Sequence, residues 1–106
     1  MKTKILNKTW TIKESTTQEI GDVMISSNRY YAGACDYMTK TIHILKDLDP
    51  QIKRETLTHE LGHAIMHEAS LNEHLNDKQK EQYCEFLKFA YPIVHDVITQ
   101  TINKKL

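Results

Sequence analysis

Residues 49–67, DPQIKRETLTHELGHAIMH, predict the helix around which the rest of the chain is organised. Asp49 can cap the N-terminus with a carboxylate oxygen, and Pro50 suits the first helical position. Apolar residues then follow at roughly helical spacing, at Ile52, Leu57, Leu61, Ala64 and Ile65. We therefore expect a helix that runs to about His67.

The segment before this helix has the patterns of β-strands. Residues 10–13 and 22–26 both alternate and contain β-branched side chains. Residues 30–35 and 40–45 are two extended runs that residues 36–39, a short polar segment, join. This arrangement predicts a β-hairpin just before the helix.

Alternation along the second strand of this hairpin predicts which side chains are inside. Ile42, Ile44 and the neighbouring Leu45 are expected to face a core. Thr41 and His43 are expected to face outward, because successive side chains of a strand point to opposite faces.

The segment after the helix predicts a second long helix. Residues 68–76 form a polar connection, after which Asn76 or Asp77 can cap a helix that extends to about Asn103. Pro92 lies inside the apolar pattern, so a kink or break is expected at the residue before it. Strands come first and helices second, which predicts an α+β fold.

Composition limits the class of protein. The 106 residues, 40% hydrophobic and 26% charged, suit one compact domain, residues 1–106, β-rich over 1–46 and helical over 49–104. A net charge of zero argues against a direct nucleic-acid partner, and no run reaches the roughly 20 apolar residues that cross a membrane. Cys35 and Cys84 are expected to be small buried residues in a reducing compartment, so we expect a cytoplasmic protein.

The predicted helix carries a motif with its own chemistry, HELGH at residues 59–63. His59 and His63 lie four residues apart and therefore on one helix face, where both can bind one zinc ion. Glu60 lies beside the ion rather than on it, so it can take a proton from a water that the metal activates. Gly62 lowers helix propensity, which close packing of this helix against a neighbour would explain.

A catalytic zinc ion usually has three protein ligands, so a third is needed from elsewhere in the chain. The last helix offers Glu81 and Glu85, one turn apart. Glu81 can bind the ion while Glu85 orients a ligand histidine from behind. The reverse assignment remains open on these grounds.

The other histidines and the tyrosines have weaker claims. His67 can be a further ligand but is better explained as a residue that stabilises the helix C-terminus. Exposure is expected for His74 in the polar connection, and a surface position for His95. The tyrosines Tyr30, Tyr31 and Tyr37 can supply a hydroxyl near the metal, although packing is the better interpretation for each.

Two segments together resemble the ImmA/IrrE family of metallopeptidases, especially the short versions from phages and mobile elements. They are residues 56–67, TLTHELGHAIMH, and residues 81–87, EQYCEFL. The resemblance covers roughly residues 30–95. It implies a gluzincin-like fold, in which a twisted, antiparallel-rich sheet packs beside two helices that carry the ligands.

The family's second motif is a glutamate followed four residues later by Asn or Asp, with a small residue between them. By resemblance Glu81 is then the third ligand, Cys84 takes the small position and Glu85 takes the place of Asn or Asp. Because Glu85 departs from the usual residue type, the roles of the two glutamates stay exchangeable.

Two functions compete on this basis. The first is a one-zinc metalloendopeptidase with Glu60 as general base. Better-known members of the family cleave repressor-type DNA-binding proteins, which suggests a regulatory protein of a phage or mobile element as the substrate, in the host cytoplasm. The second is a non-enzymatic interaction module on the same scaffold with structural zinc or none. Glu60 favours the first, because a structural site needs no base.

Overall fold

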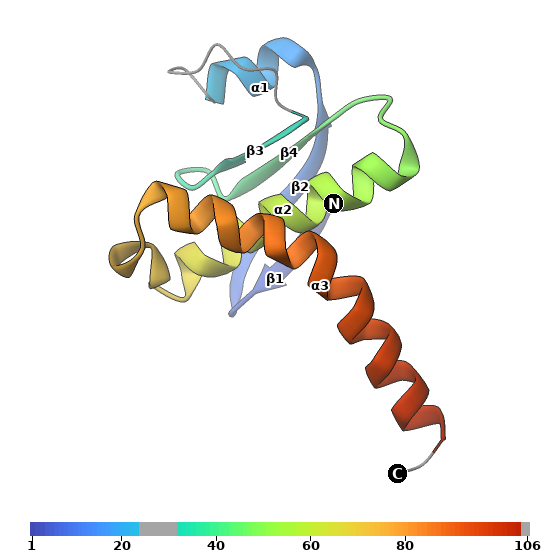
Figure 1. Ribbon diagram of the computed structural model, residues 1–106. Helices are drawn as coiled ribbons and strands as arrows, with labels where there is room; N and C mark the ends of the chain where they lie inside the picture. Colours follow the sequence, from blue (N-terminus) through green and yellow to red (C-terminus); the bar gives the residue numbers. More distant parts are fainter. Residues whose placement is uncertain (24–31, 105–106) are drawn as a thin grey trace.

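The computed structural model describes residues 1–23 and 32–104. The fold is α+β, and all four strands precede the two long helices along the chain (Figure 1). Its elements are β1 (Lys2–Ile5), β2 (Lys8–Ser15), α1 (Thr17–Val23), β3 (Gly33–Asp36), β4 (Thr41–Leu45), α2 (Pro50–Glu68), the short 3-10 helix η1 (Leu71–His74) and α3 (Asp77–Asn103).

The four strands form one mixed sheet in the order β1-β2-β4-β3. The predicted hairpin is present as the antiparallel pair β3–β4, and β1 pairs with β2 in the same sense. The central pair, β2 with β4, is parallel, with Ile12 opposite Ile42. The expectation of an antiparallel-rich sheet therefore holds for its two outer pairings and not for its centre.

Each face of the sheet packs against a different helix. On one face Trp10, Ile42 and Ile44 form a buried cluster with Ala64 of α2. On the other face Ala34 and Leu45 pack against Ile20 of α1. Ile42, Ile44 and Leu45 are thus all buried, as the alternation predicts, but Leu45 belongs to the second cluster. The sheet lies between α1 above and α2 and α3 below (Figure 1).

The predicted strand over residues 22–26 is wrong where the structure describes it, because α1 covers Thr17–Val23; residues 24–26 lie outside the described part. A capping box starts this helix: the Glu19 amide donates to Thr16 Oγ1 at 3.2 Å and the Thr16 amide donates to Glu19 Oε1 at 3.0 Å. Thr16 and Glu19 are three residues apart in the sequence, so the start of this helix could have been predicted from the sequence.

Both long helices begin where local chemistry predicts. Asp49 accepts a hydrogen bond from the Gln51 amide at 2.9 Å, with Pro50 in the first turn. Asn76 caps α3 in a reciprocal pair with Gln79. No helix among the described residues is long and apolar enough to cross a membrane.

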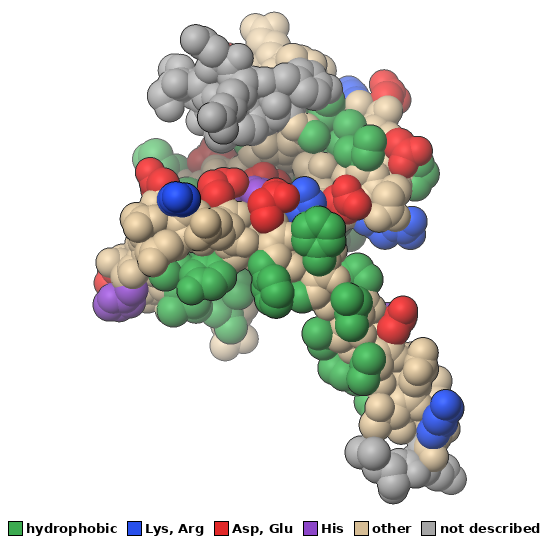
Figure 2. Space-filling view, viewed as in Figure 1, with side chains coloured by type: hydrophobic (Ala, Val, Ile, Leu, Met, Phe, Trp, Pro, Cys, Tyr) green, Lys and Arg blue, Asp and Glu red, His purple; other side chains and the backbone are tan. Residues whose placement is uncertain are grey.

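Pro92 bends α3 without ending it. The helix runs unbroken from Asp77 to Asn103, and Figure 1 shows its second half turning away from the domain. A proline removes one helical hydrogen bond and crowds the preceding turn, which accounts for the change of direction. Residues 91–100 are all exposed, and Figure 2 shows apolar side chains along one side of this projecting half.

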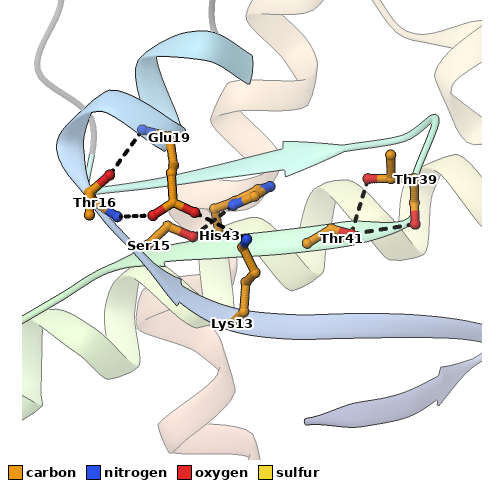
Figure 3. A network of polar contacts seen from close by, with 7 residues as sticks. All are labelled: Lys13, Ser15, Thr16, Glu19, Thr39, Thr41 and His43. Atoms are coloured by element: carbon orange, nitrogen blue, oxygen red, sulfur yellow. Dashed lines mark hydrogen bonds and ion pairs between the residues drawn. The ribbon is translucent and has the colours of Figure 1, made fainter.

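His43 is buried, so the prediction of a surface position is wrong. Its side of β4 is covered by α1, which the strand prediction for residues 22–26 left out. His43 is 7% exposed, and its Nδ1 lies 2.8 Å from the hydroxyl of Ser15, which is itself fully buried (Figure 3). Burial lowers the pKa of His43, and the nearby Lys13 ammonium adds to this, so the neutral ring is favoured.

Candidate metal centre

One face of α2 presents both histidines of the motif. The rings of His59 and His63 have centroids 5.0 Å apart, and both side chains are largely buried beneath α3. The close packing expected at Gly62 is present: a Cβ atom built there would lie 3.1 Å from Cys84 Sγ and 3.4 Å from a Leu87 methyl group. The glycine lets α3 approach α2 closely enough to bring its own side chains to the two imidazoles.

Glu81 lies between the two imidazoles. Its Oε2 is 3.1 Å from Nε2 of His59 and its Oε1 is 2.9 Å from Nε2 of His63. Two nitrogens and a carboxylate thus converge at one point from two helices. This donor set is one that zinc accepts.

Glu85 contacts the opposite nitrogen of the first histidine. Its Oε1 lies 2.9 Å from Nδ1 of His59, and Lys88 donates to Oε2 at 3.0 Å. Burial alone would raise the pKa of Glu85, but the Lys88 ammonium and His59 outweigh it and lower the pKa. A charged carboxylate at Nδ1 fixes the ring so that Nε2 faces Glu81.

His63 has one nitrogen without a protein partner. Its Nδ1 is buried and accepts or donates no hydrogen bond among the described residues, whereas its Nε2 faces Glu81. Burial lowers the pKa of His63, although Glu81 acts in the opposite direction. The neutral imidazole favoured by burial is the form that binds metal ions.

Glu60 is the most enclosed acid of the group. It is 7% exposed, and burial raises its pKa to about 8, with the charge of Glu81 adding to the shift. β3 covers it closely: a Cβ atom at Gly33 would lie 3.2 Å from Glu60 Cγ. A buried carboxyl with so high a pKa beside two histidines and a second carboxylate is typical of a functional site.

The close approach at Gly33 predicts a loss of stability for Gly33→Ala. The added Cβ would lie 2.8 Å from Thr56 Cγ2 and 2.9 Å from the His43 carbonyl oxygen, so strand and helix must move apart. We expect a decrease in the free energy of unfolding of about 1–3 kcal/mol in chemical denaturation. The matched control is Gly21→Ala, where nothing lies within 4 Å and no loss is expected. Equal stabilities of the two variants would contradict this packing.

Cys84 is a second candidate third ligand. One ligand atom from each of His59, His63 and Cys84 lies within 4.8 Å of the others. However, Glu81 already spans both Nε2 atoms at about hydrogen-bond distance. Burial also raises the pKa of Cys84 to about 12, which keeps the thiol neutral, and its sulfur packs on Gly62. Geometry therefore favours the carboxylate, and the sequence analysis preferred a small buried residue to a ligand at Cys84, which is 1% exposed.

The ring of His67 packs against two aromatic side chains. Its ring stacks on Tyr37 with centroids 4.6 Å apart and meets the edge of Trp10 at 6.4 Å. The neighbouring Glu68 accepts hydrogen bonds from Trp10 Nε1 at 3.0 Å and from Lys40 Nζ. His67 and Tyr37 are therefore packing residues that tie the end of α2 to the sheet.

The remaining residues from the sequence analysis lie outside the cluster. His74 is exposed in η1, and His95 is 61% exposed on α3, both as expected. Tyr30 and Tyr31 lie outside the described residues.

The chain matches a known protein family. The IrrE N-terminal-like domain, a peptidase family, matches residues 8–96. No curated protein and no solved structure matches the chain. The matched segment includes the whole cluster on α2 and α3 and most of the sheet, and the chain therefore belongs to the IrrE N-terminal-like peptidase family.

Proposed function

We propose that this chain is a zinc-dependent endopeptidase in which His59, His63 and Glu81 hold one ion and Glu60 is the general base. The observation that carries the proposal is the position of the Glu81 carboxylate between the two Nε2 atoms, at 3.1 and 2.9 Å. Family membership supports a peptidase. With the ligands on two helices beside the sheet, the finer fold assignment that we propose is gluzincin-like.

The position of each side chain indicates its role in the proposed hydrolysis. When bound, a zinc ion polarises the scissile carbonyl, makes a neighbouring water more acidic and favours the ionised form of Glu60. Glu60 takes the proton of the attacking water on a carboxylate oxygen and returns it to the leaving amine nitrogen. Glu85 holds His59 through Nδ1, at 2.9 Å, and so keeps its Nε2 in place.

A peptide substrate can bind along β3. This strand is at the end of the described sheet order, so one edge of its backbone is not paired within that sheet. Its residue Gly33 lies directly over Glu60. An extended peptide added to this edge would run beside the general base, held by backbone hydrogen bonds that do not depend on its sequence.

The substrate that we propose is a repressor-type regulatory protein of a phage or mobile element, in the host cytoplasm. The alternative is an interaction module without activity. The buried Glu60 favours the enzyme. Burial of a carboxyl group lowers stability, and a purely structural zinc site does not need a base beside its ligands.

Zinc affinity in single variants tests the assignment of the ligands. Glu81→Ala should lose the most affinity, because it removes a direct ligand. Glu85→Ala should weaken binding by roughly 10–100-fold, the usual effect of losing a partner behind a ligand histidine. Cys84→Ala should bind as the wild type does. Competition with a chromogenic zinc chelator measures all three, and a larger loss in Cys84→Ala than in Glu81→Ala would overturn the ligand set.

A further inference from the structure

The packing of the described residues leaves the second half of α3 exposed. From Phe86 onward, eight apolar side chains of this helix are each between 51% and 72% exposed: Phe86, Phe89, Tyr91, Ile93, Val94, Val97, Ile98 and Ile102. Figure 2 shows apolar side chains continuing along one side of the projecting half. At roughly 100 Å² apiece they present on the order of 800 Å², about what each partner buries in a standard interface.

This half is also a poor helix by itself. Seven of the ten residues in 93–102 are β-branched, IVHDVITQTI, and such residues lower helix propensity. Isolated helices of this length are marginal in water even with good helix formers. Its conformation therefore requires packing against something that the described part of a single chain does not provide.

The polar residues show which side would stay in solvent. Lys88, His95, Asp96, Thr99 and Asn103 recur at helical spacing and lie opposite the apolar side. His95 and Asp96 are the two acidic or basic residues between positions 89 and 103. An apolar face with so few charges resembles the interior of a permanent interface rather than a transient one.

The chain also carries a groove that suits this helix. On the side of α3 that carries Phe86, a cavity of about 530 Å³ is lined by apolar residues of α2, α3 and the segment between them. These include Ile65 and Met66 of α2, Leu71 of η1, and Tyr83 and Phe86 of α3. The projecting helix and the groove belong to the same chain. In a dimer with a two-fold axis, the groove of each copy can therefore bury the projecting helix of the other.

We propose that α3 mediates a homodimer, with the projecting half of each copy packed along α3 and the groove of its partner. The large apolar area, the low helix propensity and the neighbouring groove all support a second copy of this chain. The contact uses the side of α3 marked by Phe86, Val97 and Ile98, whereas Glu81 and Glu85 lie among the candidate metal residues. The dimer is thus independent of the proposed catalytic activity.

Light scattering after size-exclusion chromatography tests this directly with the full chain. The wild type should have twice the 12.4 kDa mass of one chain at micromolar concentration. Val97→Glu should have the mass of a single chain. Because Val97 is 56% exposed in one chain, the new charge is not buried in the monomer and folding should be retained. Thr99→Glu, on the polar side, is the matched control and should remain dimeric.

Hydrogen exchange provides a second measurement that does not need a variant. Amides of residues 93–103 should be protected in concentrated wild-type protein and should lose that protection on dilution. A wild type with the mass of one chain at every concentration would overturn the proposal, as would a larger assembly or a dimer that survives Val97→Glu. A monomer that protects the same amides only with a different protein would assign the surface to that partner instead.

Discussion

Replacing Glu60 with Gln is expected to abolish peptide hydrolysis while leaving the zinc in place. The change removes the group that accepts the proton and keeps the size of the side chain. General-base catalysis contributes typically about 10²–10⁴-fold, so the rate should fall by at least about 10²-fold. The measurement is mass spectrometry of new N-termini after zinc-loaded protein is incubated with a proteome-derived peptide library.

The control for this experiment is Glu55→Gln, which changes a glutamate on the same helix. Glu55 accepts a hydrogen bond from Gln51 and has no contact with the two histidines among the described interactions. It should cleave at the wild-type rate. If Glu60→Gln cleaves as fast as the wild type with zinc bound, the proposed base is wrong; if no zinc-loaded form cleaves anything, the interaction module is favoured.

Replacing His63 with Ala is expected to remove zinc binding and the stability that comes with it. A ligand present at about 100 times its Kd stabilises the folded state by about 2.7 kcal/mol. For a domain of this size that corresponds to a rise in melting temperature of roughly 10 °C or more. The wild type should show this rise when zinc is added, and His63→Ala should not.

His74→Ala is the matched control, since it removes an exposed histidine of η1. Its melting temperature should respond to zinc as that of the wild type does. Differential scanning calorimetry with and without zinc measures all three proteins. An undiminished response in His63→Ala would show that the ion binds elsewhere.

Local chemistry made the helices predictable. Each cap is made by residues that are close in the sequence: Asp49 with Pro50 at the start of α2, and Asn76 with Gln79 at the start of α3. The starts of both helices could therefore be predicted from the sequence. α1 was missed although Thr16 and Glu19 form a capping box as clear as these, because alternation in residues 22–26 was given more weight.

Long-range contacts could not be predicted. The parallel pairing of β2 with β4 brings together residues about 30 positions apart, and no local pattern encodes it. His43 followed the alternation rule correctly in pointing away from Ile42 and Ile44. The sequence did not reveal that α1 covers that second face and that Ser15 meets the ring there.

The candidate site also has a part that the sequence predicted and a part that only the structure shows. The spacing of His59 and His63 is a property of any helix, so their shared face was predictable. The different contacts of Glu81 and Glu85 depend on how α3 crosses α2, which Gly62 and Cys84 determine through close packing. Only the structure shows that one glutamate faces Nε2 and the other Nδ1.

X-ray absorption at the zinc edge of the purified protein tests the central claim most directly. The account predicts one zinc per chain with nitrogen and oxygen neighbours alone, at about 2.0–2.2 Å, including two imidazoles. A protein that takes up no zinc would contradict the account. So would a sulfur neighbour at about 2.3 Å, which would place Cys84 on the ion in place of the proposed set.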